Sequence, residues 1–245
     1  MSRTDILHPP GPHCQDEPSR TREHLHLATL RLSVAAVAAL MVAGWTDVLT
    51  YDRSAIADGQ LWRLFTGHLT HWNLDHLLWD VLAFFALGAL IEQRSRRTFL
   101  AALGLSTVAI SATLMVGQPA LIEYRGLSGI DSGLFTAAAV LLFGEVWRKG
   151  KKLLAGAIVL AMLGFLAKIA YELTTGATLF VDSAAAGFVP LPLAHAVGGA
   201  AGIVAVWATR AGGNRWQTRQ TRDSNETTPS WSTSAAKGVT RAPGI

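Results

Sequence analysis

The chain has 245 residues, of which 50% are hydrophobic and 16% are charged, whereas roughly a quarter of the residues in an ordinary soluble domain are charged. This composition excludes a disordered, collagen-like or disulfide-stapled chain, and the single Cys14 can close no intrachain disulfide. Polar residues gather at the two ends of the chain, and long apolar runs fill its middle. We therefore expect a membrane domain over residues 28–209, between a polar N-terminal tail at 1–27 and a disordered C-terminal tail at 210–245.

Apolar segments long enough to cross a membrane occur six times along the chain. A helix needs about 20 apolar residues to cross the hydrocarbon core, and only a helix or a closed barrel pairs all of its backbone groups there. The predicted fold is therefore all-α, a polytopic bundle of six transmembrane helices. The predicted spans are 28–48, 73–92, 98–117, 128–147, 153–173 and 190–209.

The basic residues predict how these spans are oriented. Lys and Arg gather in alternate connections, namely in both tails, at 94–97 and at 148–152, while the other connections hold only Arg53, Arg63 and Arg125. Short basic connections stay in the cytoplasm, so both termini are predicted to be cytoplasmic. This asymmetry accounts for the sequence pI of about 9.6. A nucleic-acid partner is the weaker interpretation, because the basic residues form short clusters beside helices.

Polar side chains interrupt the second, fourth and sixth spans. Such groups cost several kcal/mol in a membrane unless they are paired or hydrated, so each is a candidate site residue. The interrupting residues are His76, Asp80, Ser128, Asp131 and His195. In the predicted topology these residues, on three separate segments, lie at a similar shallow depth below the outer membrane surface. This placement predicts a water-accessible cavity that opens to the extracytoplasmic side.

The fifth predicted span carries two opposite charges, on Lys168 and Glu172. Residues four positions apart lie on one face of a helix. We expect these two side chains to form a one-turn pair near the outer interface.

Ser128 is the candidate nucleophile. It lies in the motif Gly126-Leu127-Ser128-Gly129, where a loop enters a predicted helix. Glycines permit a tight turn there, and N–H groups at a helix N-terminus can stabilise an oxyanion. The same motif also occurs in ordinary small-residue packing, so the assignment depends on a second component, a base.

His195 is the candidate base. It shares a helix face with Gly198 and Gly202, so a neighbouring helix can approach closely beside the imidazole. Serine becomes a good nucleophile when a base removes its proton. The sequence therefore predicts a Ser128–His195 dyad that attacks a carbonyl, with the Ser128 N–H and the His76 side chain as candidate oxyanion donors. No aspartate is placed by the sequence to orient His195.

Five motifs follow one another between residues 59 and 205. In chain order they are Trp62-Arg63, HLTHWNLDHLLWD with His71 and His76, ALGALIEQRSRR with Gly88 and Glu92, Gly126-Leu127-Ser128-Gly129, and His195 followed by Gly198 and Gly202. With these motifs in this order, the chain resembles the rhomboid family of intramembrane serine proteases. Its compact layout looks most like the rhombosortase branch, which is thought to process C-terminal sorting segments of secreted proteins.

The resemblance implies a serine endopeptidase that cleaves a membrane-anchored protein in or near its transmembrane segment. It implies no metal and no cofactor, and a site facing the extracytoplasmic side of a bacterial inner membrane. The implied nucleophile and general base are Ser128 and His195. The other implied roles are oxyanion stabilisation by His76, Asp80, Gly126 and Leu127, helix packing by Gly129, Gly198 and Gly202, and shaping of the first loop by Trp62, Arg63 and His71.

Two positions depart from the family pattern. Asp80 stands where many members have an amide, and an acid donates a hydrogen bond only when it is protonated. Ser132 stands where an aromatic ring often stacks under the histidine. Ser132 and the adjacent Asp131 are therefore possible orienting partners of His195, although Asp131 fits a hydrated cavity wall as well.

Three other functions compete with proteolysis. A catalytically inactive rhomboid-like protein that escorts membrane helices would share the fold but would be expected to lose Ser128 or His195, and both are present. A small transporter often has two inverted halves, and no repeat relates 28–117 to 128–209. A metal site has suitable ligand types but copies no known zinc spacing; its candidate ligands are His71, His76, Asp80 and His195.

Overall fold

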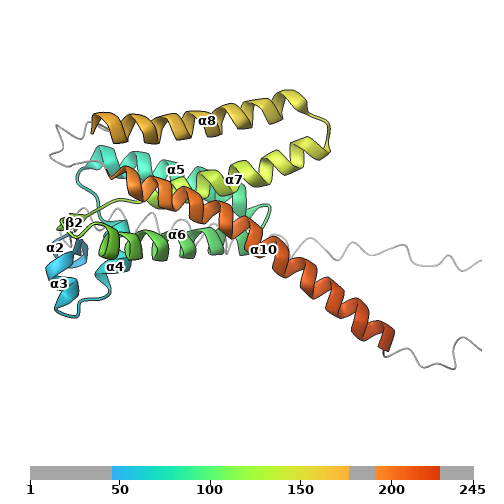
Figure 1. Ribbon diagram of the computed structural model, residues 1–245, viewed down its shortest axis with the longest axis horizontal. Helices are drawn as coiled ribbons and strands as arrows, with labels where there is room; N and C mark the ends of the chain where they lie inside the picture. The colour runs from blue at the N-terminus through green and yellow to red at the C-terminus, as the bar shows by residue number, and fades with distance from the viewer. Residues whose placement is uncertain (1–45, 177–190, 227–245) are drawn as a thin grey trace, which may run out of the picture.

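The computed structural model describes residues 46–176 and 191–226 (Figure 1). The predicted tail at 1–27 and nearly all of the predicted first span at 28–48 lie outside these residues. The described chain begins with short elements, which are α2 (Thr46–Leu49), β1 (Tyr51–Asp52), α3 (Arg53–Ala57), α4 (Arg63–Thr66) and the 3₁₀ helix η1 (Gly67–Leu69). The long helices are α5 (Leu74–Glu92), α6 (Arg96–Gly117), α7 (Ser128–Arg148), α8 (Lys152–Thr175) and α10 (Pro192–Glu226), and β2 (Glu123–Tyr124) lies between α6 and α7.

Five of the described helices are long and apolar enough to cross a membrane, namely α5, α6, α7, α8 and the first part of α10. They coincide in order with the second to sixth predicted spans, which confirms a largely helical bundle built from apolar segments. The total of six spans and the side on which the termini lie stay predictions.

Local sequence explains where two of these helices begin. The Asn73 side chain accepts a hydrogen bond from the His76 backbone N–H at 2.8 Å and caps α5. Ser95 caps α6 in the same way through the Thr98 N–H, at 3.2 Å. Asn and Ser satisfy the free N–H groups of a first helical turn. The α5 cap places His76 in the first turn of its helix, at the same end of the bundle as the start of α7.

The last helix differs from its prediction. The sixth span was predicted to end at residue 209, with a disordered tail from 210, but α10 continues to Glu226 (Figure 1). A helix that has already formed extends without a new nucleation cost, and no proline occurs between Pro192 and Pro229. Residues 210–226 of the predicted tail are therefore helical.

The backbones of α7 and α10 approach each other closely through glycines. A Cβ atom added to Gly198 would collide with the carbonyl oxygen of Gly129, and one added to Gly202 would collide with that of Gly133. Small residues allow this kind of contact between membrane helices. The predicted packing role of Gly129, Gly198 and Gly202 thus has a clear geometric basis, and the contact brings the first turns of the two helices together.

Helix α8 lies at the side of the bundle (Figure 1). Of its 24 residues, only Ala155, Ile169 and Glu172 are buried. Most of its other side chains are apolar and exposed, as expected for a helix in contact with lipid. One of the three buried residues, Glu172, is ionisable.

A small sheet ties the segment before α5 to the segment before α7. Strands β1 and β2 are antiparallel, with Tyr51 opposite Tyr124. The buried Arg63 guanidinium donates to the carbonyl oxygens of Asp47 and Thr50, each at 2.8 Å. These hydrogen bonds hold the segment that precedes β1. This scaffold supports the loop that leads into Ser128.

Candidate active site

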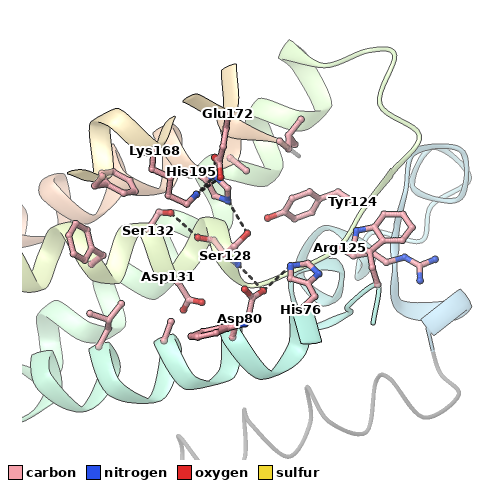
Figure 2. A pocket seen from close by; sticks show the side chains of 18 of the residues that line it. His76, Asp80, Tyr124, Arg125, Ser128, Asp131, Ser132, Lys168, Glu172 and His195 are labelled. Atoms are coloured by element: carbon pink, nitrogen blue, oxygen red, sulfur yellow. Dashed lines mark hydrogen bonds and ion pairs between the residues drawn. The ribbon is translucent and has the colours of Figure 1, made fainter. Parts of the chain in front are cut away.

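A cavity of about 370 Å³ opens between α5, α7, α8 and α10. Each of these helices contributes polar side chains to its wall, and Figure 2 shows them pointing toward one another. The residues that form its polar centre are His76, Asp80, Ser128, Lys168, Glu172 and His195. Apolar and aromatic side chains line most of the remaining wall, so the polar groups act in a partly dehydrated space.

Ser128 and His195 form a hydrogen bond inside this cavity. The Ser128 Oγ is 3.0 Å from the His195 Nε2 (Figure 2). Ser128 is the first residue of α7, and His195 lies in the first turn of α10. The distance is within the range over which a histidine can take the proton of a serine nucleophile.

The other ring nitrogen of His195 contacts a carboxylate. The Nδ1 atom is 2.7 Å from Glu172 Oε2, and the second Glu172 oxygen accepts from Lys168 Nζ at 2.6 Å. Two acceptor lone pairs would repel at 2.7 Å, so a hydrogen must lie between Nδ1 and the carboxylate. In the neutral form of the ring, this hydrogen is the one on Nδ1, and Nε2 can then accept from Ser128.

A second polar cluster surrounds Asp80, on the other side of Ser128. Asp80 Oδ2 accepts hydrogen bonds from the backbone N–H groups of Leu127, at 2.8 Å, and Ser128, at 3.1 Å. The Nε2 atoms of His71 and His76 are 3.2 and 3.3 Å from the same oxygen. Two backbone N–H groups thus donate to one oxygen position next to the Ser128 side chain, with two imidazole nitrogens beside it, and the oxygen that occupies this position belongs to the protein itself.

Gly126 makes this convergence possible. Its φ angle is +120°, a conformation that other residues rarely adopt, and an added Cβ would lie 2.8 Å from the His76 ring. A side chain at this position would be strained and would also displace the imidazole. The glycine therefore lets the backbone turn so that the Leu127 and Ser128 N–H groups point toward Asp80.

In the described part of the chain, no hydrogen bond joins His195 to Asp131 or Ser132, the two possible orienting partners predicted from the sequence. Ser132 Oγ donates instead to the carbonyl oxygen of Ser128, at 2.8 Å, one turn earlier in α7. Asp131 is buried, and its Oδ1 atom has no hydrogen-bond partner in the described part of the chain. The contacts of the His195 ring go to Ser128, Glu172 and Lys168.

The loop residues Trp62 and His71 differ in how they relate to the site. Trp62 Nε1 donates to the Val48 carbonyl oxygen at 3.2 Å, away from the cavity. His71 holds the loop through a hydrogen bond from Nδ1 to the Leu69 carbonyl oxygen, at 3.1 Å, and its Nε2 reaches Asp80. The role of His71 is thus wider than shaping the loop.

The imidazole and carboxylate groups of the cavity include the ligand types of a metal site. Within 46–176 and 191–226, no group of three or more His, Cys, Asp or Glu side chains is arranged to hold a metal ion. Most of the imidazole and carboxylate groups at the centre of the cavity belong instead to two hydrogen-bonded clusters, one around His195 and one around Asp80.

Residues 58–212 match the family model of the Rhomboid domain, which is more than half of the chain. The chain belongs to the rhomboid family. Together with its five long apolar helices, this membership makes it an integral membrane protein. A comparison with curated proteins found no match. The matched range of this rhomboid protein includes all the residues of both polar clusters.

Sequence reasoning missed one residue of the rhomboid site, Glu172. It anticipated the pair with Lys168, and the structure forms that pair, but it did not place the carboxylate against His195. The available signal was an ionisable side chain near the outer end of a predicted span, at the same depth as Ser128 and His195. What the sequence could not supply was the rotation of α8 that turns this side chain inward.

Proposed function

We propose that this rhomboid protein is a serine endopeptidase that cleaves a peptide bond in or near the transmembrane segment of a membrane-anchored protein. Rhomboid proteins are generally intramembrane proteases. The observation that carries the proposal is the 3.0 Å contact between Ser128 Oγ and His195 Nε2 in the wall of a cavity between membrane-type helices.

The proposed reaction is acyl transfer through Ser128. Its Oγ attacks the carbonyl carbon of the substrate, while its proton moves to His195 Nε2. Collapse of the tetrahedral intermediate breaks the C–N bond, and His195 returns the proton to the leaving amine. A water molecule then attacks the acyl-enzyme with His195 as base, which releases the second product and restores Ser128.

The proposed oxyanion position is the one that Asp80 Oδ2 occupies. The N–H groups of Leu127 and Ser128 already point there, and the His76 imidazole lies beside them. Preorganised donors of this kind stabilise the negative charge of a tetrahedral intermediate. A substrate carbonyl must displace the Asp80 carboxylate to reach them, so Asp80 competes with the substrate in this proposal.

The position of the site along the bundle supports an extracytoplasmic active site. His76, Ser128 and His195 lie at the starts of their helices and Glu172 near the end of α8, so all four share one end of the bundle. The basic connections lie at the opposite end, which the charge rule assigns to the cytoplasm. We extend the proposal to a bacterial inner membrane and, from the motif layout, to C-terminal sorting segments as substrates.

Labelling by a fluorophosphonate probe tests the proposed activity. Such a probe phosphonylates an activated serine, so the wild-type protein in isolated membranes should be labelled and Ser128→Ala should not. Ser54→Ala is the matched control, since Ser54 is an exposed residue of α3 outside the cavity and should leave labelling unchanged. An unlabelled wild-type protein that is folded would contradict proteolysis and favour the escort function, for which the occupied oxyanion position is the supporting observation.

We expect Asp80→Asn to accelerate labelling. Hydrogen bonds to a charged acceptor are stronger than neutral ones by about 1 kcal/mol, so a neutral amide should leave the Leu127 and Ser128 N–H groups more readily, and its NH₂ can donate to an oxyanion. The fluorophosphonate rate constant should rise roughly tenfold. Asp58→Asn, on an exposed acid outside the cavity, should have no effect. A rate that falls tenfold in Asp80→Asn would show that the carboxylate assists the reaction.

A further inference from the structure

The packing of α8 does not by itself explain why Glu172 is buried. Only three of the 24 residues of α8 are buried, and the Glu172 side chain is 0% exposed. A charged side chain in a membrane helix is costly unless it is paired. A glutamate turned inward from a helix with so few buried positions therefore points to a specific partner.

Both oxygens of the Glu172 carboxylate have such partners. Oε2 is 2.7 Å from His195 Nδ1, and Oε1 is 2.6 Å from Lys168 Nζ (Figure 2). Lys168 lies one turn earlier on the same helix, so its ammonium group keeps the carboxylate in place and charged. Lys168 Nζ is also 3.2 Å from His195 Nδ1, but the proton on Nδ1 faces Glu172, and an ammonium group cannot accept it.

We propose that Glu172 is a positioning residue for His195, so that Ser128, His195 and Glu172 act together as a triad. This inference rests on the proposed serine protease function. The hydrogen bond from Nδ1–H to Glu172 selects the tautomer in which Nε2 can accept the Ser128 proton. It also fixes the plane of the ring. When that proton reaches Nε2, the carboxylate stabilises the imidazolium ion and remains unprotonated itself.

A purely structural alternative is that Glu172 only docks α8 on α10. The two roles differ in what they change. Docking affects how much protein folds, whereas positioning affects the reactivity of Ser128 in the folded protein and the pH at which it appears. Among the described residues, the ionisable side chains that line the cavity with His195 are Glu172 and Lys168 from α8, His76 and Asp80 from α5, Asp131 from α7, and Glu123, Tyr124 and Arg125 from the segment before α7. Only Glu172 is altered in the test.

The test compares Glu172→Gln and Glu172→Asp in the full-length protein. The readout is the rate constant of fluorophosphonate labelling per mole of folded protein, measured as a function of pH. Glu172→Gln keeps the size of the side chain but removes its charge, and should lower the rate on the order of 10²-fold or more. The acid limb of its pH profile should move to lower pH, because the imidazolium ion loses its anionic partner. Glu172→Asp retains the charge and should be labelled at least about tenfold faster than Glu172→Gln.

Glu145→Gln is the matched control. Glu145 is paired with Lys149 at 2.7 Å and four residues' separation, as Glu172 is with Lys168, but it lies at the other end of the bundle. Its substitution should leave the rate and the pH profile unchanged. Labelling of Glu172→Gln within threefold of the wild-type rate would overturn the triad. A lower total labelling that is fully explained by a lower amount of folded protein, with an unshifted pH profile, would overturn it as well. A wild-type protein that fails to label would instead overturn the proposed function.

Discussion

Replacing Ser128 with alanine is expected to abolish cleavage of a co-expressed membrane substrate. The substitution removes the Oγ atom that lies 3.0 Å from His195 Nε2, and no other hydroxyl contacts this nitrogen in the described part of the chain. Loss of a serine nucleophile lowers turnover on the order of 10⁶-fold in serine proteases, which is below detection in a cell-based assay. The measurement is the ratio of cleaved to intact substrate in immunoblots of membranes.

The interpretation of Ser128→Ala depends on an unchanged protein level. Among the residues that the structure describes, Ser128 Oγ forms a hydrogen bond only with His195, and the backbone contacts of Ser128 to Asp80 and Ser132 do not need its side chain. We therefore expect the variant to accumulate and melt like the wild type. Cleavage that persists in Ser128→Ala would mean that another residue is the nucleophile or that another protease is responsible, and a host that lacks the protein separates these two cases.

Replacing His195 with alanine should have an effect nearly as large. The imidazole forms hydrogen bonds with both Ser128 and Glu172, so its loss removes the base and disconnects the carboxylate. Turnover should fall by at least about 10³-fold, because a serine hydroxyl without a base is a poor nucleophile. Cleavage of the same substrate and the rate of fluorophosphonate labelling both measure this loss.

His195→Ala also leaves Glu172 without its imidazole partner. Lys168 still neutralises that carboxylate, so we expect only a modest loss of thermal stability in detergent. Labelling of His195→Ala within tenfold of the wild-type rate, at equal folded protein, would contradict a general-base role. In that outcome Lys168 becomes the alternative base to test, because its Nζ lies in the same cluster.

The elements that the sequence predicted well are those with a local physical cause. A span must be long enough to cross the hydrocarbon core, and every residue inside it must be compatible with lipid. The predicted span at 128–147 accordingly matches α7 (Ser128–Arg148), and that at 153–173 matches α8 (Lys152–Thr175). The continuation of α10 past residue 209 was missed, because polar residues end a membrane span without ending a helix.

The sequence did not predict the short elements or the pairing of segments that lie far apart along the chain. Strands β1 and β2 have two residues each and lie more than 70 residues apart. Nothing in either segment has the alternation that indicates a strand. The pairing depends on the surrounding scaffold, including the Arg63 hydrogen bonds to backbone carbonyl groups.

The site shows the same division between local and tertiary causes. Ser128, His195, His76 and Asp80 were identified because they are polar groups in apolar segments, a property that each segment shows by itself. The tertiary structure decided that Asp80 accepts hydrogen bonds from the oxyanion N–H groups, and that Glu172 rather than Asp131 meets His195. These contacts depend on the rotation and approach of whole helices.

By itself, then, the sequence determined a membrane bundle with a serine and a histidine near one end of their helices, because hydrophobic length and the cost of polar groups in lipid act within a single segment. The tertiary structure decided how these groups are connected. Close approach of α7 and α10 at Gly198 and Gly202 sets the distance from Ser128 to His195, and the docking of α8 brings in the carboxylate. Such distances of a few ångströms arise from packing between helices, which no single segment encodes.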